Sequence, residues 1–410
     1  MIHAAMVCAI LFGAGQEVKD VAAGYRVAGL EDRRFNHETL WKLLEPLVAS
    51  PAIGVEQIGR SIQGREIRAL HFGRGSTRVL LWSQMHGDES TATMALADIT
   101  RFLVEAEGDP LRERLGRELT ITMVPMLNPD GAERFTRWNA IGVDVNRDAR
   151  QQATPEGRAL KTLRESINPQ FGFNLHDQEA RKLAGENGEQ VAIALLAPAA
   201  DEARTYGAAR SRARLVAATI VSALEGDIAG RIAKYDDAFT PRAFGDLMQS
   251  WGTSTVLIES GAIRGDVHKQ ELRRLNVIAL LEALDAIATG SYRDADPTLY
   301  EGLPENERIE HDVILRGGKV VVGDNPPFEV DVGFWFEDPV AREGAHLGDV
   351  GDLTDTLTIE AIDVSGLLVH VETLGKGGAG GDRLEHDEPV FIEVRDDDGT
   401  VVHRFGKRPD

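Results

Sequence analysis

Four short apolar runs of this 410-residue chain each end at, or just before, a residue that can take part in chemistry. Segments with helical spacing of apolar residues separate them, so we predict strands that alternate with helices. This alternation is typical of an α/β fold with a mostly parallel sheet, whose carboxyl edge binds ligands. The runs are 78–82, 119–127, 171–175 and 253–258, and the residues at their ends are His86, Asn128, His176 and Glu259.

The turn after the first run carries an imidazole and a carboxylate three residues apart, His86 and Glu89, ahead of a predicted helix over residues 90–104. Such a pair can coordinate one metal ion. A catalytic zinc takes three protein ligands and leaves a fourth position for water. His176, at the end of a neighbouring strand, is the natural third ligand. For the short pair alone, the alternative is a surface His and Glu that are close by chance.

Glu259 ends an apolar run, where a carboxylate contributes little to solubility. A carboxylate near zinc can take the proton of the bound water; the alternative is a structural acid that caps the following turn. Residues 137–147 add positive charge near the same edge. A guanidinium beside zinc, such as that of Arg137, can stabilise an oxyanion. Arg147 with its neighbour Asn146 can clamp a carboxylate. Ordinary loop ion pairs are the alternative for both arginines.

The acidic composition excludes one class of partner. The formal net charge is −21, whereas a nucleic-acid surface needs a basic patch, so we expect no nucleic-acid partner. Because the chain has a single cysteine, Cys8, it cannot form an internal disulfide. We expect Arg210, Arg212 and Arg214 to form a solvated helical face.

Residues 1–15 resemble a signal peptide, with a short apolar run that ends in small residues, although Lys and Arg are missing from its start. Export to the periplasm or the exterior is favoured over cytoplasmic residence, and both stay open. The run is too short to span a membrane. No other segment approaches transmembrane length, so we expect no membrane span.

The chain is long enough to hold two domains. We predict a catalytic domain over residues 16–292, with a mostly parallel mixed sheet flanked by helices. A polar stretch with two prolines, 293–306, is a plausible linker. Residues 307–410 contain short apolar runs between Gly, Asp and Pro turns, which predicts a small β-sandwich of structural or positioning role.

Five motifs occur together in an order that resembles the zinc carboxypeptidase family, the carboxypeptidase A-like metallopeptidases. The motifs are His86-x-x-Glu89, Asn128-Pro129-Asp130-Gly131, Gly142-Val143-Asp144-Val145-Asn146-Arg147, His176 and Glu259. The resemblance covers residues 20–290. It implies a metallocarboxypeptidase that hydrolyses the C-terminal peptide bond by promoted-water attack, on a peptide or small amide with a free carboxylate.

The resemblance also implies roles for the matching positions. One zinc ion per chain would be held by His86, Glu89 and His176, and Glu259 would act as general base and acid. Arg137 would polarise the scissile carbonyl and hold the oxyanion.

For the substrate's terminal carboxylate, the resemblance implies binding by Asn146 and Arg147. The family also has a mobile tyrosine that closes on the substrate, and Tyr235 is the candidate here. The specificity pocket is expected among residues 236–255. Its acids, Asp236, Asp237 and Asp246, either favour a basic terminal residue or form a solvated loop.

One departure from the pattern of the resembled family keeps a second activity open. The pancreatic-type enzymes carry an Arg at the position of Asp88, and its loss puts long peptides in doubt. The segment His-Gly-Asp-Glu also resembles the desuccinylase and aspartoacylase group, so the alternative is a zinc deacylase acting on N-acyl amino acids. A catalytically silent binding protein is a third reading, although the complete set of site residues argues against it. The sequence carries no signal for the oligomeric state.

Overall fold

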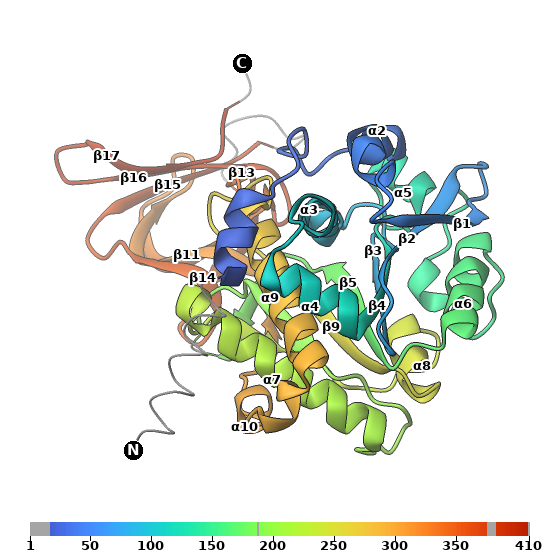
Figure 1. Ribbon diagram of the computed structural model, residues 1–410. Coiled ribbons are helices and arrows are strands. Elements are labelled where there is room, and N and C mark those ends of the chain that lie inside the picture. The colour runs from blue at the N-terminus through green and yellow to red at the C-terminus, as the bar shows by residue number, and fades with distance from the viewer. Residues whose placement is uncertain (1–16, 187, 375–382, 409–410) are drawn as a thin grey trace. The chain divides into compact units, whose positions relative to one another are not determined.

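The computed structural model describes residues 17–186, 188–374 and 383–408. They divide into two compact units, which Figure 1 colours along the chain. The first unit contains residues 17–178, 192–261 and 268–305, and the second contains 179–191, 262–267 and 306–408. The predicted signal peptide, 1–15, lies outside the described residues.

An eight-stranded mixed sheet forms the centre of the first unit, with strand order β1-β2-β4-β3-β5-β9-β7-β8. The central strands β4, β3, β5 and β9 run parallel, β8 is parallel to β7, and the other pairs are antiparallel. This confirms the predicted mixed α/β sheet. The strands are β1 (Gly54–Arg60), β2 (Glu66–Gly73), β3 (Thr77–Ser83), β4 (Leu119–Val124), β5 (Phe171–Asp177), β7 (Ile193–Leu196), β8 (Ile232–Lys234) and β9 (Ser254–Ser260).

Helices cover both faces of this sheet (Figure 1). On one face, α6 and α8 share a buried cluster with β2 and β3 that includes Trp82, Leu160 and Phe244. On the other face α3, α4 and α7 each contact α9, and both α3 and α7 also contact central strands. The helices are α2 (His37–Val48), α3 (Thr91–Glu105), α4 (Pro110–Glu118), α5 (Pro129–Arg134), α6 (Pro155–Ile167), α7 (Ala208–Ile228), α8 (Phe244–Ser250) and α9 (Gln270–Thr289).

The strand boundaries follow from local chemistry. Every residue of β5 and of β9 is buried, because strands covered on both faces have no solvated side. β4 ends at Val124, earlier than the predicted run 119–127. Pro125 follows it, and a proline has no backbone N–H to donate to a neighbouring strand. The chain then turns into α5, whose first turn contains Pro129.

The segment expected to link two domains contains regular structure. A 3-10 helix, η2 (Ser291–Asp294), and the short helix α10 (Thr298–Glu301) lie within it. Tyr300 is 1% exposed, and its hydroxyl accepts a hydrogen bond from the Ala197 N–H at 2.9 Å. Residues up to 305 therefore pack as part of the first unit.

The second unit is built of strands. Seven of them hydrogen-bond as one sheet that branches at β11, whose first half pairs with β14 and whose end pairs with β15. Strands far apart in the sheet order share one apolar core, which includes Phe334, Leu347 and Ile392, so the sheet closes on itself. The strands are β11 (His311–Val321), β12 (Phe328–Asp338), β13 (Glu343–Gly351), β14 (Thr358–Asp363), β15 (Leu368–Thr373), β16 (Val390–Arg395) and β17 (Val401–Phe405).

Two inner segments of the chain, 179–191 and 262–267, also belong to this second unit. The first contains β6 (Lys182–Ala184), which pairs antiparallel with β10 (Asn306–Arg308). Within the ranges that the structure describes, no helix has the length and apolar character needed to cross a membrane.

Candidate metal centre and active site

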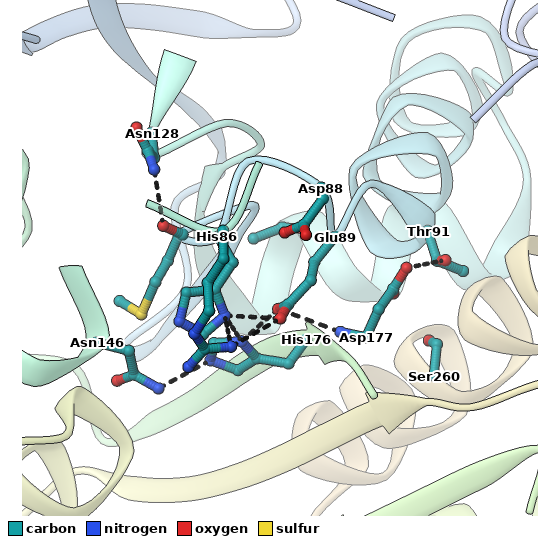
Figure 2. Close-up of polar contacts among 12 residues, drawn as sticks. His86, Asp88, Glu89, Thr91, Asn128, Asn146, His176, Asp177 and Ser260 are labelled. Carbon is teal, nitrogen blue, oxygen red and sulfur yellow. Dashed lines mark hydrogen bonds and ion pairs between the residues drawn. The ribbon is translucent and has the colours of Figure 1, made fainter. Parts of the chain in front are cut away.

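The turn after β3 packs closely against the start of α5. A Cβ on Gly87 would lie 1.9 Å from the carbonyl carbon of Gly131, so only glycine lets the turn approach α5 this closely. Asn128 joins the two segments: its Nδ2 donates to the Met85 carbonyl at 3.2 Å, and its Oδ1 accepts from the Gly131 N–H at 2.9 Å. Figure 2 shows this contact above His86. The side chains that follow the turn are therefore placed by backbone packing.

Three buried side chains converge at the carboxyl ends of β3 and β5 (Figure 2). The Nδ1 atoms of His86 and His176 each lie 2.7 Å from an oxygen of Glu89. The two Nδ1 atoms are 3.2 Å apart. The exposed fractions of the three residues are 2%, 2% and 7%. Within the described part of the chain, this is the group of His, Cys, Asp and Glu side chains that is able to hold a metal ion.

The donor atoms fit zinc. Two imidazole nitrogens with one carboxylate oxygen are a known ligand set of catalytic zinc sites, and three protein ligands leave a position for water. Two nitrogens bound to a tetrahedral zinc at about 2.0–2.1 Å lie about 3.3 Å from each other. The separation of the His86 and His176 Nδ1 atoms matches that value. Both imidazoles already present the same nitrogen to the point that a metal would occupy.

The electrostatics of the cluster favour a positive charge. Burial lowers the pKa of His86, but the charge of Glu89 and hydrogen bonds to Asp144 and Glu89 outweigh it and raise the pKa to about 9. Burial raises the pKa of Glu89, but the two histidines outweigh it and hold the pKa well below its usual range. A ligand releases its proton when it binds a metal. A divalent cation bound here would therefore replace the positive charge that the proton gives to His86.

Asp144 is a site residue that we did not single out from the sequence. Its Oδ1 lies 3.0 Å from His86 Nε2, and its Oδ2 accepts from Arg137 Nη2 at 2.8 Å. The signal was present, since Asp144 belongs to the motif at 142–147. A carboxylate on the far nitrogen of a ligating imidazole sets its orientation and tautomer.

We therefore expect Asp144→Asn to weaken zinc binding by about 10- to 100-fold, the usual effect of removing such a partner. Competition with a chromogenic chelator measures the affinity. Glu56→Gln is the matched control, because Glu56 pairs with His71 at 3.1 Å on the exposed side of the sheet. Equal affinity in the Asp144 variant and the wild type would show that Asp144 does not orient His86.

The structure brings Arg137 and Asn146 against the metal-binding cluster. Arg137 Nη1 lies 3.2 Å from His86 Nδ1 and 3.5 Å from Glu89, and its side chain remains 37% exposed. Asn146 Nδ2 lies 3.3 Å from His176 Nε2, while its Oδ1 accepts from the Phe244 N–H at 2.9 Å. Arg137 thus reaches the cluster from the solvent side, and Asn146 is held by the start of α8.

Arg147 and Tyr235 complete the predicted set. Arg147 is exposed and donates from Nη1 to the Asn146 carbonyl at 2.9 Å. The negative charge of Glu259, followed by burial, raises the pKa of Tyr235 to about 12. Tyr235 directly follows β8, and its N–H donates to the Leu195 carbonyl at 2.9 Å, next to Ala194, the register partner of Glu259 on β7.

Glu259 lies beside His176, one of the three converging side chains. It is the register partner of His176 on the adjacent parallel strand, and it is 8% exposed. Burial, followed by the charge of Glu89, raises the pKa of the Glu259 carboxyl well above its ordinary value. A carboxyl with a raised pKa binds a proton more readily than a solvated glutamate does, which suits a group that accepts and returns a proton.

The expectation of a solvated arginine face on α7 is wrong for Arg210, which is 1% exposed. Its Nη2 donates to Asp237 at 2.7 Å and its Nε donates to the Ala197 carbonyl at 3.0 Å. Asp237 also pairs with Arg204, so its charge is neutralised within the protein. Burial raises the pKa of Asp246 to about 6, and its Oδ1 accepts from the Thr240 N–H.

Comparisons with known proteins agree with this geometry. Residues 45–187 match the family model described as zinc carboxypeptidase. An uncharacterised protein of Zymomonas mobilis is 25% identical over 142 residues, or 34% of this chain and 37% of that protein. Carboxypeptidase 2 of Trichophyton rubrum is 28% identical over 108 residues, or 26% of this chain and 20% of that protein. The chain thus spans well under half the length of these curated relatives.

A solved structure has a fold similar to a large part of this chain. The metallo-carboxypeptidase of Burkholderia cenocepacia aligns over 63% of this chain and 70% of its own, with a TM-score of 0.51 and 19% identity. The motifs, the three-residue metal cluster and the family match lead to one assignment. Residues 45–187 of this chain match the zinc carboxypeptidase family, as the resemblance of its motifs implied.

Proposed function

We propose that this protein is a zinc-dependent carboxypeptidase that removes the C-terminal residue of a peptide or small amide with a free carboxylate. The observation that carries the proposal is the convergence of His86, Glu89 and His176, with Glu259 as the strand neighbour of His176. Three ligands and an adjacent carboxyl are the parts that promoted-water hydrolysis needs.

When bound, zinc lowers the pKa of a coordinated water to about 7 and polarises a carbonyl. The remaining work belongs to the chain's own side chains. Glu259 accepts the proton of the attacking water at a carboxylate oxygen and returns it to the leaving amine. Arg137, part-exposed beside the cluster, donates to the oxygen on which negative charge develops.

Substrate recognition is assigned to the loop that carries Asn146 and Arg147. The exposed guanidinium of Arg147 can form charge-assisted bonds to the terminal carboxylate. Because Asn146 contacts His176, this loop would hold a bound carboxylate in a fixed position relative to the metal centre. We assign to Tyr235, which follows β8 near the strand that carries Glu259, the role of closing on the bound substrate.

The test measures zinc content together with hydrolysis of blocked dipeptides that differ in their C-terminal residue. We expect release of the terminal amino acid, loss of activity after treatment with a chelator, and recovery when zinc is added back. A preparation that holds no zinc at neutral pH would contradict the metal centre. Bound zinc with no release from any dipeptide would contradict the peptidase assignment.

The alternative is a zinc deacylase, and one observation favours it. Asp88 lies within the metal-binding turn as a half-buried carboxylate, where an arginine would assist extended peptides. N-succinyl and N-acetyl amino acids are therefore tested in the same assay. Faster turnover of these compounds than of every blocked dipeptide would replace the carboxypeptidase with the deacylase.

A further inference from the structure

A buried lysine lies directly behind the candidate metal centre. Lys269 is 4% exposed, and its Nζ donates to Asp177 Oδ2 at 3.0 Å and to the Ser260 carbonyl at 3.2 Å. Asp177 is itself 9% exposed. Lysine is almost never fully buried unless it is paired, since removing the ammonium from water is costly. The pair is therefore a specific feature of this site and not a surface ion pair.

The position of Lys269 contradicts two local preferences. Its φ is +52°, in the left-handed region that favours glycine or asparagine. It also immediately precedes α9, and the positive end of a helix dipole disfavours a cation there. Its side chain does not cap the helix and points inward to Asp177. A residue with an unfavourable backbone conformation and charge position is tolerated where a tertiary contact compensates for the free-energy cost.

Asp177 connects that ammonium to the metal-binding residues. It directly follows His176, and its N–H donates to Glu89 Oε2 at 3.3 Å. Its Oδ2 also accepts from Thr91 Oγ1 at 2.7 Å. Figure 2 shows both contacts, with Asp177 between Glu89 and Thr91. One carboxylate therefore joins the end of β5 to the start of α3.

The second contact of Lys269 reaches the strand that carries Glu259. Ser260, whose carbonyl accepts from Nζ, directly follows Glu259 and is the register partner of Asp177. Its hydroxyl also accepts from Asn276 Nδ2, on α9, at 2.8 Å. Lys269 therefore ties together the two strand ends that present His176 and Glu259.

We propose that Lys269 and Asp177 are positioning residues that set the separation of Glu89, His176 and Glu259. For Glu259 the inference rests on the proposed function, whereas for the two metal-binding residues it is independent of the substrate. A small displacement of a ligand or of a proton acceptor is costly, because catalysis depends on the placement of groups to within about 1 Å.

The principal variant is Lys269→Met, which keeps most of the side-chain volume and removes the ammonium. We expect zinc affinity to fall by about 10- to 100-fold, as when a partner of a metal ligand is lost. The visible absorption bands of the cobalt-substituted protein should shift, because they report ligand geometry. In the zinc-saturated enzyme we expect kcat to fall while KM stays nearly constant.

The chain offers a matched control one turn further along α9. Arg273 is 1% exposed and pairs with Asp98, which is 2% exposed, with an Nε–Oδ2 distance of 2.7 Å. Its other contacts are the Val27 and Leu30 carbonyls and, at 3.2 Å, Gln270 Oε1, none of which belongs to the strand ends. Arg273→Met should lower the midpoint of thermal unfolding, yet leave the cobalt spectrum, zinc affinity and kcat of the folded protein unchanged.

The proposal is overturned if Lys269→Met lowers thermal stability but keeps the wild-type cobalt spectrum and zinc affinity, as the control does. If Lys269→Met does not fold, the double variant Asp177→Asn with Lys269→Met removes the pair without leaving an unpaired buried charge. The cobalt spectrum and the zinc affinity of the double variant then test the positioning role. If the wild type hydrolyses no peptide, the proposed function fails, while the cobalt and zinc measurements still test the positioning role.

Discussion

Glu259→Gln is expected to abolish turnover while zinc remains bound. Glutamine has nearly the same shape as glutamate but cannot accept the proton of the attacking water. Proton transfer by a positioned side chain contributes about 10²- to 10⁴-fold, so kcat should fall by at least that factor. Because Glu259 lies beside the His–Glu–His group and outside it, the metal content should stay at one zinc per chain. Elemental analysis and steady-state kinetics on the same preparation measure both quantities.

Glu282→Gln is the matched control for this experiment. Burial, followed by the charge of Asp285, raises the pKa of Glu282 to about 7, so Glu282, like Glu259, is a glutamate whose pKa burial raises. It lies on α9, away from the ends of the central strands. Its variant should retain full activity. Retained activity in Glu259→Gln would remove Glu259 from its catalytic role, and loss of zinc there would make it part of the metal site.

His176→Ala is expected to lose both zinc and activity. The substitution removes one of three converging donors and leaves His86 and Glu89, which cannot by themselves complete a zinc site of three protein ligands. After dialysis the zinc content should be close to zero, and added zinc should restore no measurable turnover. Circular dichroism and thermal unfolding check that the variant is folded.

The control for that variant is His71→Ala. His71 is a part-buried histidine on β2 that contacts Thr122 and Glu56, at 3.2 and 3.1 Å, away from the metal centre. It should keep zinc and activity. Full zinc occupancy in His176→Ala would exclude His176 from the ligand set and would require another donor for the centre.

Much of the site could be read from the sequence because its parts are local. Each central strand is a short apolar run, and parallel strands bring their carboxyl ends to one edge of a sheet. His86 and Glu89 are three residues apart. His176 lies 90 residues after His86, and it is expected beside them because its strand ends at the same edge of the sheet. The family resemblance added roles to these positions, and the metal cluster then formed where the motifs predicted it.

Contacts between segments that are distant in sequence were not predictable in this way. Asp144 reaches His86 because the loop before it closes on Asn139, whose Oδ1 accepts from the N–H groups of Ile141 and Val143. Arg210 follows a spacing typical of a solvated helical face, yet its partner Asp237 comes from a loop 27 residues away. No periodic pattern distinguishes a paired arginine from a solvated one.

The sequence by itself determined the α/β class, the central strands and the three candidate ligands, since these depend on local periodicity and short motifs. The tertiary structure decided which charges are buried and which segments join the second unit. β6 belongs there because Lys182 pairs in register with Arg308. Lys269 shows the same limit: in the sequence it is one lysine before a helix, and only folding places its ammonium against Asp177. Long-range pairing and burial are properties of the assembled chain, and local spacing does not encode them.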